Sequence, residues 1–320
     1  MNFILSEMTF LRYFMPLIIE GNHRGIKSKM YVGKNNKYNN PRIFLDHLER
    51  LSRKHNFEIL EIQDADKCTG IVFLIEGVGC DRLDRSRTTT VSMTYMTDYS
   101  GLYDSYVDKV DHIIFPSRYF AEIYNKKSPK NLYLGSPKYD ITLDKNEINE
   151  KYKLTNNKKA LIIYPKTIYK SSVDLDRIYF ILENLGYDIV VKSRGKDPVN
   201  DKKHKGDAYY SDKSWYPHTT MELIEVSDIV INFNSTGVKE CVLLRTPLIN
   251  FNVKPWMPLK ELYDYEYCHK FQKDFEDKEF EDVVNDLTSK DLTKAFDTSI
   301  QEHLFAGDSS KRILDYLELL

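Results

Sequence analysis

Residues 227–251 read SDIVINFNSTGVKECVLLRTPLINF, and their pattern indicates the fold class most clearly. They contain an apolar run at 228–233, a helical pattern at 236–244 and a second apolar run at 247–251. A strand, a helix and a strand in this order form a βαβ unit, in which the two strands are parallel. The sequence therefore predicts a parallel sheet here, with any ligand at the carboxyl ends of its strands.

The turn between this strand and helix is the strongest candidate site. It reads Asn234-Ser235-Thr236-Gly237, and Glu240 lies one helical turn further on. Free N–H groups at a helix start bind anions, and the small Gly237 lets a phosphate come close. Glu240 could accept hydrogen bonds from the two hydroxyls of a ribose. Plain helix capping by Ser235 or Thr236, with Glu240 compensating the helix dipole, explains the same residues equally well.

The same rhythm of apolar runs and amphipathic stretches extends along most of the chain. Helical patterns such as 41–55 and 173–185 separate the runs, and this alternation predicts parallel sheets covered by helices. The further runs that predict strands are 2–5, 29–32, 57–62, 70–75, 90–95, 112–116, 131–135, 160–165 and 187–192.

A polar stretch rich in lysine and asparagine, residues 136–158, interrupts this rhythm and reads as a connector. We therefore predict an α/β protein with two Rossmann-like doubly wound domains and a cleft between them. The expected domains are 1–140 and 141–305, with 306–320 as a last helix that packs back toward the domain junction.

Composition excludes several classes of protein. The 320 residues are 42% hydrophobic, which excludes a disordered chain, and 46 basic against 48 acidic residues argue against a nucleic-acid binder. No apolar run reaches the ~18 residues that span a bilayer, and the start makes a poor signal peptide. The four cysteines form no CxxC pair, and the eight histidines show no metal-binding spacing. We expect a cytoplasmic protein without a metal, and contact with a membrane surface stays open.

Three stretches resemble a known group of enzymes. The order strand, S-T-G-x-x-E, apolar helix, R-x-P and strand in 228–251 resembles the nucleotide-binding half of GT-B-fold glycosyltransferases. Non-hydrolysing sugar-nucleotide 2-epimerases and CDP-glycerol glycerophosphotransferases share this pattern. NLYLGSPKYD, 131–140, resembles the strand and turn that close their first domain, and AGDSSKRILDYL, 306–317, resembles their last helix. The first 130 residues resemble these enzymes only in the alternation of apolar runs and helical patterns.

The resemblance implies a donor site for a UDP-, GDP- or CMP/CDP-linked sugar in the second domain. Ser235, Thr236 and Gly237, together with Asn234, would hold the diphosphate, and Glu240 would bind the ribose. Further donor-site candidates are Lys166, Lys192 and Arg194, which follow strands, and His218, which would lie beside the base. His218 as a surface residue before a helix is the simpler alternative.

The chain departs from the relatives at two motifs. Glycerophosphotransferases show His-Gly-Thr in the first domain and Lys-x-His-Pro in the second. This chain has Thr97-Asp98-Tyr99-Ser100-Gly101 and Lys192-Ser193-Arg194-Gly195 there, without either histidine, and the 2-epimerase signatures are also absent. The leading hypothesis is therefore a metal-independent glycosyltransferase with no cofactor, acting on a saccharide or glycoconjugate. A CDP-polyol phosphotransferase, a sugar-nucleotide 2-epimerase and a non-catalytic nucleotide-sugar-binding module are the alternatives.

The first domain should supply the base and the acceptor site. Acids that follow strands are natural bases, which makes Asp98, Glu76 and Glu7 the catalytic candidates, and each could instead be a cap or loop acid. The loop 80–88 follows a strand and should overhang the cleft. Its arginines could grip an anionic acceptor, or form salt bridges with neighbouring aspartates instead. The acceptor-binding candidates are Arg82, Arg85, Arg87 and Tyr99.

Overall fold

The computed structural model describes residues 1–33, 45–95, 103–124, 127–166, 172–193, 208–210, 216–253, 259–305 and 307–318. The chain divides into two compact units. The first comprises Met1–Ile141 and His303–Leu320, and the second comprises Thr142–Glu302.

The first unit is built on a seven-stranded parallel sheet with the order β3-β2-β1-β4-β5-β6-β7. The chain moves outward from β1 to β3, then returns to β4 on the other side of β1, so the order reverses between β1 and β4. Its strands are β1 (Asn2–Leu5), β2 (Ser28–Val32), β3 (Phe57–Glu61), β4 (Gly70–Ile75), β5 (Thr88–Met93), β6 (His112–Phe115) and β7 (Asn131–Tyr133). Its helices are α1 (Leu11–His23), α2 (Leu45–His55), α3 (Tyr103–Tyr106), α4 (Arg118–Tyr124) and α11 (Ser309–Leu317).

Strand β1 is buried on both faces because its consecutive side chains point to opposite sides of the sheet. Phe3 stacks on Phe73 of β4 and contacts Phe14 of α1, with ring centroids 5.1 and 5.2 Å away. Ile4, on the other face, joins a separate buried cluster that includes Tyr103 of α3. Helices therefore cover both faces, as an all-parallel sheet requires.

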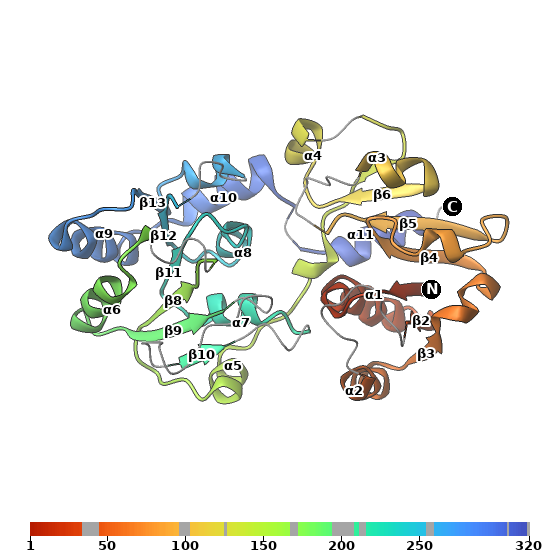
Figure 1. Ribbon diagram of the computed structural model, residues 1–320, viewed down its shortest axis with the longest axis horizontal. Helices are drawn as coiled ribbons and strands as arrows, with labels where there is room; N and C mark the ends of the chain where they lie inside the picture. Colours follow the sequence, from red (N-terminus) through yellow and green to blue (C-terminus); the bar gives the residue numbers. More distant parts are fainter. Residues whose placement is uncertain are drawn as a thin grey trace. The chain divides into compact units, whose positions relative to one another are not determined.

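The second unit repeats this topology with a six-stranded parallel sheet in the order β10-β9-β8-β11-β12-β13. Figure 1 shows α6 and α9 on one side of this sheet and α7 and α8 on the other. The strands are β8 (Lys159–Ile163), β9 (Asp188–Lys192), β10 (Ala208–Tyr210), β11 (Ile229–Asn232), β12 (Leu248–Phe251) and β13 (Cys268–Phe271). The helices are α5 (Lys145–Tyr152), α6 (Leu175–Asn184), α7 (Thr219–Glu225), α8 (Val238–Leu243), α9 (Asp277–Ser289) and α10 (Thr293–His303).

The predicted α/β class with two Rossmann-like doubly wound sheets is confirmed, and both sheets follow the same order of strands. The sequence analysis missed the two edge strands of the second sheet, β10 and β13. Strand β10 spans only three residues and β13 is partly exposed, so neither shows the longer apolar run that identifies central strands.

The stretch 136–158 is not only a connector, because it contains α5. Asp144 caps this helix by accepting hydrogen bonds from the N–H groups of Asn146 and Glu147. Lys151 and Tyr152 at its end both bond to the carboxylate of Glu222 on α7, which is only 4% exposed. A polar helix is therefore held by one buried carboxylate and by capping, which a hydrophobic pattern does not reveal.

The last helix, α11, is anchored to the chain segment that follows β7. The Asp140 carboxylate accepts hydrogen bonds from the N–H groups of Ser309 and Ser310 in its first turn. Arg312 donates from Nε to the carbonyl of Leu134 at 3.1 Å. In Figure 1 the dark-blue α11 accordingly lies among elements of the first unit.

We expect Asp140→Ala to lower the free energy of unfolding of the first unit by about 1–2 kcal/mol, because two N–H groups at the start of α11 lose their acceptor. Urea unfolding followed by circular dichroism measures this. Glu122→Ala is the control, since it removes an exposed carboxylate of the same unit that pairs with Arg118 within its own helix, α4. Equal effects of the two variants would contradict the anchoring role of Asp140.

Candidate functional site

The carboxyl edge of the second sheet is the candidate site. The strand order reverses between β8 and β11, and ligands of open α/β sheets bind beside such a reversal. The turn after β11 lies over the end of β8, because a Cβ on Gly237 would sit 3.1 Å from Cδ1 of Ile163. Gly237 therefore allows a close approach between this turn and the neighbouring strand.

The turn from Asn234 to Gly237 supplies the acceptors for three N–H groups at the start of α8. Ser235 Oγ accepts from the N–H of Gly237 at 3.2 Å, and the Ser235 carbonyl accepts from the N–H of Val238 at 3.4 Å. The N–H of Lys239 donates to the Thr236 carbonyl at 3.3 Å. Contrary to the expectation of free N–H groups, these three have acceptors within the turn. Anion binding here therefore depends on the surrounding side chains as well.

A buried amide network lies beneath the turn. Asn250 Oδ1 on β12 accepts hydrogen bonds from Asn232 Nδ2 and from the N–H of Asn234, at 2.8 and 2.9 Å. Asn250 Nδ2 donates to Asn234 Oδ1 at 3.2 Å. The Tyr263 hydroxyl accepts from Asn232 Nδ2 at 3.0 Å and donates to the Ser235 carbonyl at 2.6 Å. Asn234 has a φ of 49°, a left-handed conformation that asparagine tolerates better than most residues.

The sequence analysis named Asn234 but missed Asn232, Asn250 and Tyr263. A signal existed, because each of two neighbouring apolar strands ends in a V/L-I-N sequence. The structure pairs these two asparagines in register across β11 and β12. The tyrosine had no comparable signal, since it comes from a short 3-10 helix, Lys260–Tyr263, outside any strand.

Several predicted donor-site residues reach the same edge. Lys192, at the end of β9, is 7% exposed and donates from Nζ to the Ser193 carbonyl at 3.0 Å. Glu240 in the first turn of α8 and His218 at the start of α7 are both buried. Lys166 lies exposed three residues beyond β8. Arg194 lies outside the described residues.

Two of the three predicted catalytic acids occupy the corresponding edge of the first sheet. Glu7 follows β1 and Glu76 follows β4, the two strands between which the order reverses. Both are half-buried. Glu7 Oε2 accepts from Thr9 Oγ1 at 3.2 Å, and Glu76 has a φ of 48°. Asp98 and the acceptor candidate Tyr99 lie outside the described residues.

Comparison with known proteins supports the architecture. No family model matches the chain, and no curated protein sequence matches it. The structure is similar to wall teichoic acid polymerase TagF, with a TM-score of 0.66, 13% identity and coverage of 99% of this chain and 88% of that one. It is also similar to a glycotransferase of kitacinnamycin, with a TM-score of 0.61, 9% identity and coverage of 99% and 97%. The chain has the GT-B fold.

A third similar structure is the UDP-GlcNAc 2-epimerase of Methanocaldococcus jannaschii in complex with UDP-GlcNAc and UDP. Its TM-score is 0.59 and its identity 10%, over 100% of this chain and 99% of that one. The neighbours of this GT-B chain are thus enzymes of more than one reaction type, so the fold alone does not select the reaction.

The cysteines of this GT-B protein are poor nucleophiles. Burial raises the pKa of Cys241 well above its ordinary value, and the neighbouring Glu240 carboxylate raises it further. Burial likewise raises the pKa of Cys268 to about 12 and the pKa of both Cys68 and Cys80. The thiolate is the nucleophilic form of cysteine, so these four thiols are not candidates for a nucleophile.

The predicted acceptor arginines do not gather at the carboxyl edge. Arg85 pairs with Asp111 at 3.3 Å, just before β6, and the Arg87 carbonyl accepts from the N–H of Gly70 at the start of β4. Both therefore lie at the amino edge of the first sheet, opposite Glu7 and Glu76. The reason is that residues 76–87 lead back along the sheet to begin the parallel strand β5. Arg82 ends a 3-10 helix in the same segment and is exposed.

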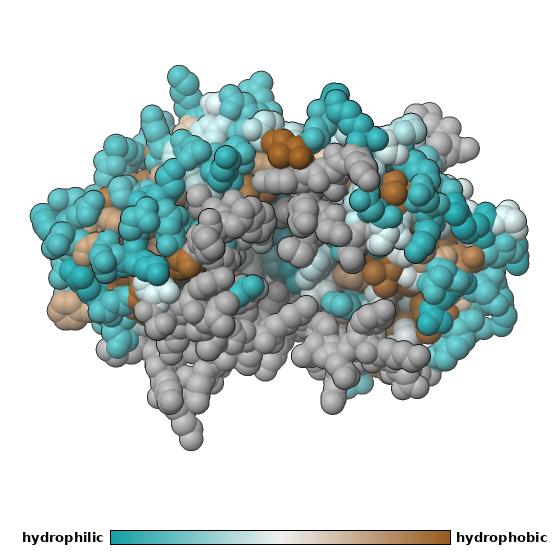
Figure 2. Space-filling view, turned by 45° about the horizontal axis from the view of Figure 1, so that its top comes forward, coloured by the Kyte–Doolittle hydropathy of each residue, from teal (hydrophilic) through white to brown (hydrophobic). Residues whose placement is uncertain are grey.

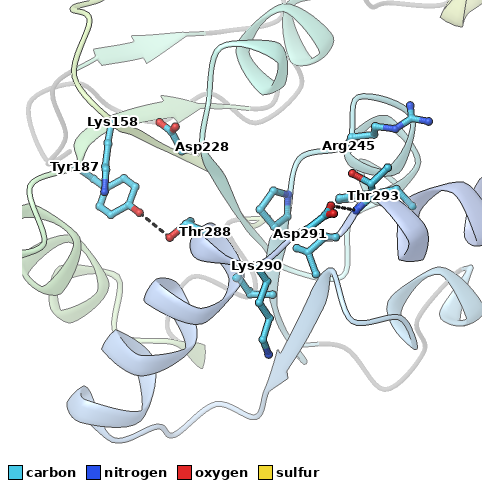
Figure 3. Close-up of a pocket in the computed structure, with 12 residues that line it drawn as sticks. Lys158, Tyr187, Asp228, Arg245, Thr288, Lys290, Asp291 and Thr293 are labelled. Carbon is cyan, nitrogen blue, oxygen red and sulfur yellow. Dashed lines mark hydrogen bonds between the residues drawn. The ribbon is translucent and has the colours of Figure 1, made fainter.

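A pocket of about 300 Å³ lies at the opposite edge of the second sheet from the candidate site (Figure 3). Lys158 and Asp228, which line it, directly precede β8 and β11. Figure 3 shows a hydrogen bond from Tyr187 to Thr288 and another between Asp291 and Thr293 across its wall. None of the predicted site residues lines this pocket.

Figure 2 shows one face of the molecule, on which hydrophobic residues are scattered among hydrophilic ones. Within the described part of the chain, no helix combines the length and apolar character needed to cross a membrane. The same residues contain no group of three or more histidine, cysteine or acidic side chains that could hold a metal ion.

The turn that carries Glu76 should be sensitive to substitution. Gly77 has a φ of +68°, and a Cβ there would lie 2.4 Å from Cβ of Tyr106. Gly25 has a φ of +72° with no atom within 4 Å of its Cβ position, so Gly25→Ala is the matched control for backbone strain. We expect Gly25→Ala to cost about 1–2 kcal/mol of unfolding free energy and Gly77→Ala roughly 1–3 kcal/mol more. Equal losses in urea unfolding would show that the close contact with Tyr106 is unimportant.

Proposed function

We propose that this protein is a glycosyltransferase that moves a sugar from a nucleotide-sugar donor to a saccharide or glycoconjugate acceptor. One observation carries the proposal. The reversal point of the second sheet gathers the turn at 234–237, the buried Lys192 and the buried Glu240 at one edge. A buried cation and a buried carboxylate beside a hydroxyl-bearing turn suit the phosphates and ribose of a nucleotide.

The second unit binds the donor in this proposal. Ser235, Thr236 and Gly237, with Asn234, contact the diphosphate, and Lys192 and Lys166 neutralise the charge that develops on the leaving group. Glu240 accepts hydrogen bonds from the ribose hydroxyls. His218 lies beside the base, and Arg194 adds a third cation near the phosphates.

The first unit binds the acceptor in this proposal, and an acid at its carboxyl edge acts as the base. In an inverting transfer, the carboxylate of Glu76, Glu7 or Asp98 takes the proton from the acceptor hydroxyl. The acceptor oxygen forms a bond to the anomeric carbon as the bond from that carbon to the diphosphate breaks. The products are the glycosylated acceptor, the nucleoside diphosphate and one proton.

A CDP-polyol phosphotransferase is the second candidate, because TagF is among the similar structures. In that reaction the acceptor oxygen attacks phosphorus and CMP leaves. The absence of both motif histidines from Thr97–Gly101 and Lys192–Gly195 argues against this chemistry. A 2-epimerase lacks its signature residues in the same way, and a non-catalytic module would bind the nucleotide and release nothing.

The donor site is tested by the melting temperature of the protein with UDP, GDP, CDP and CMP. We expect at least one nucleotide to raise it, and Glu240→Ala to weaken binding of that nucleotide about 10- to 100-fold, because hydrogen bonds to a carboxylate are lost. Glu225→Ala is the control, since Glu225 ends α7 close to the start of β11, at the opposite edge of the sheet. The donor site is refuted if no nucleotide stabilises the protein.

The nucleotide released in the presence of donor and acceptor distinguishes the candidate functions. A nucleoside diphosphate identifies the glycosyltransferase. CMP points to the phosphotransferase or to a CMP-sugar donor, and release of neither leaves a binding module or an epimerase.

The base is tested with Glu76→Gln, Glu7→Gln and Asp98→Asn. We expect one of them to lower kcat about 100- to 10,000-fold, because the acceptor proton loses its base, with the donor-induced rise in melting temperature unchanged. The amide replacements preserve shape and remove only the charge. Full activity in all three would show that the base lies elsewhere.

A further inference from the structure

We propose that Tyr263 is the positioning residue of the donor turn, holding Ser235 and its neighbours in the conformation that receives the donor diphosphate. This inference rests on the proposed function and concerns a residue that lies outside the predicted donor site. The tyrosine is 28 positions away from Ser235 in the sequence, and its hydroxyl reaches the Ser235 carbonyl at 2.6 Å.

The hydroxyl of Tyr263 is itself fixed in direction. It accepts a hydrogen bond from Asn232 Nδ2 at 3.0 Å, so its single proton is available for the Ser235 carbonyl. Asn232 is held in turn, because the same Nδ2 donates to Asn250 Oδ1 at 2.8 Å. Tyr263 and both asparagines are fully buried, and such bonds are stronger away from water.

Buried side chains form hydrogen bonds to two adjacent residues of the turn. Asn250 bonds both the N–H and the side chain of Asn234, and Tyr263 bonds the carbonyl of Ser235. Asn234 has a positive φ, a conformation that persists when surrounding contacts enforce it. The Ser235 carbonyl also accepts the N–H of Val238 at the start of α8, so the tyrosine bond reaches the backbone of the turn and the first residue of the helix.

Positioning of this kind acts on ligand affinity and leaves most of the fold intact. Tyr263→Phe removes only the hydroxyl, and Asn232 Nδ2 keeps its bond to Asn250. The ring stays in its buried place. The turn then loses one of its two anchors, and a donor must order it on binding, which weakens affinity.

Tyr267→Phe is a closely matched control. Tyr267 is also fully buried, and its hydroxyl bonds to the Leu262 carbonyl at 2.8 Å and to Ser299 Oγ at 2.7 Å. Within the part of the chain that the structure describes, it makes no hydrogen bond to the turn at 234–237. Burial raises the pKa of both phenols, so both hydroxyls are protonated over the working pH range.

The first arm of the experiment measures hydrogen–deuterium exchange in the full chain without ligand. We expect Tyr263→Phe to speed exchange of the amides from Asn234 to Lys239 by roughly tenfold, because local opening becomes easier, and Tyr267→Phe to leave them unchanged. Unchanged exchange in Tyr263→Phe, or equal acceleration in both variants, would overturn the positioning role. This arm needs no nucleotide, so its result is independent of the proposed function.

The second arm measures Kd for the stabilising nucleoside diphosphate, and KM and kcat for the corresponding nucleotide sugar. We expect Tyr263→Phe to raise Kd and KM about five- to tenfold with kcat within twofold, and Tyr267→Phe to change none of them. Faster exchange with unchanged Kd would refute the link between the turn and the donor. Failure of the wild type to bind any nucleotide refutes the proposed function and the donor half of this inference together, and the first arm still decides the positioning half. Both variants are compared at a temperature where each is folded.

Discussion

The candidate site depends on the hydrogen bonds that the side-chain amide of Asn250 makes. This amide accepts from β11 through Asn232 and from the turn through the N–H of Asn234, and it donates back to the Asn234 side chain. One side chain thus joins two parallel strands and the left-handed residue Asn234, which follows one of them. Both the oxygen and the nitrogen of the Asn250 amide are paired in a fully buried place, where an unpaired amide is costly, so these bonds favour a single arrangement of the turn.

The same principle explains why polar groups cluster at one edge of each sheet. Within a parallel sheet the backbone satisfies itself and both faces are covered by apolar side chains. Where the strand order reverses, the connections leave in opposite directions, and side chains at the strand ends must complete the hydrogen bonding. In the second unit, Asn232, Asn250 and Lys192 occupy these ends, and in the first unit Glu7 and Glu76 do.

The periodic pattern of apolar residues predicted the fold more completely than it predicted the site. Central strands such as β4 and β11 are buried along most of their length, so their apolar runs identify them directly. The edge strand β13 and the helix α5 were not predicted. Strand β13 is partly exposed, and α5 is held by the carboxylate of Glu222, so neither shows a clear apolar pattern. Arg85 and Arg87 were misplaced because a loop after one strand can end at the amino edge of the next.

The two doubly wound sheets and the turn at 234–237 could be predicted from the sequence, since both follow from local patterns of apolar and turn-forming residues. The contacts that hold this turn became visible only in the folded chain. Tyr263 meets Ser235 because chain folding brings together positions 28 residues apart, and no local pattern encodes such a contact. Tertiary structure also shows that the N–H groups of Gly237, Val238 and Lys239 already have acceptors within the turn, which no pattern in the sequence indicates.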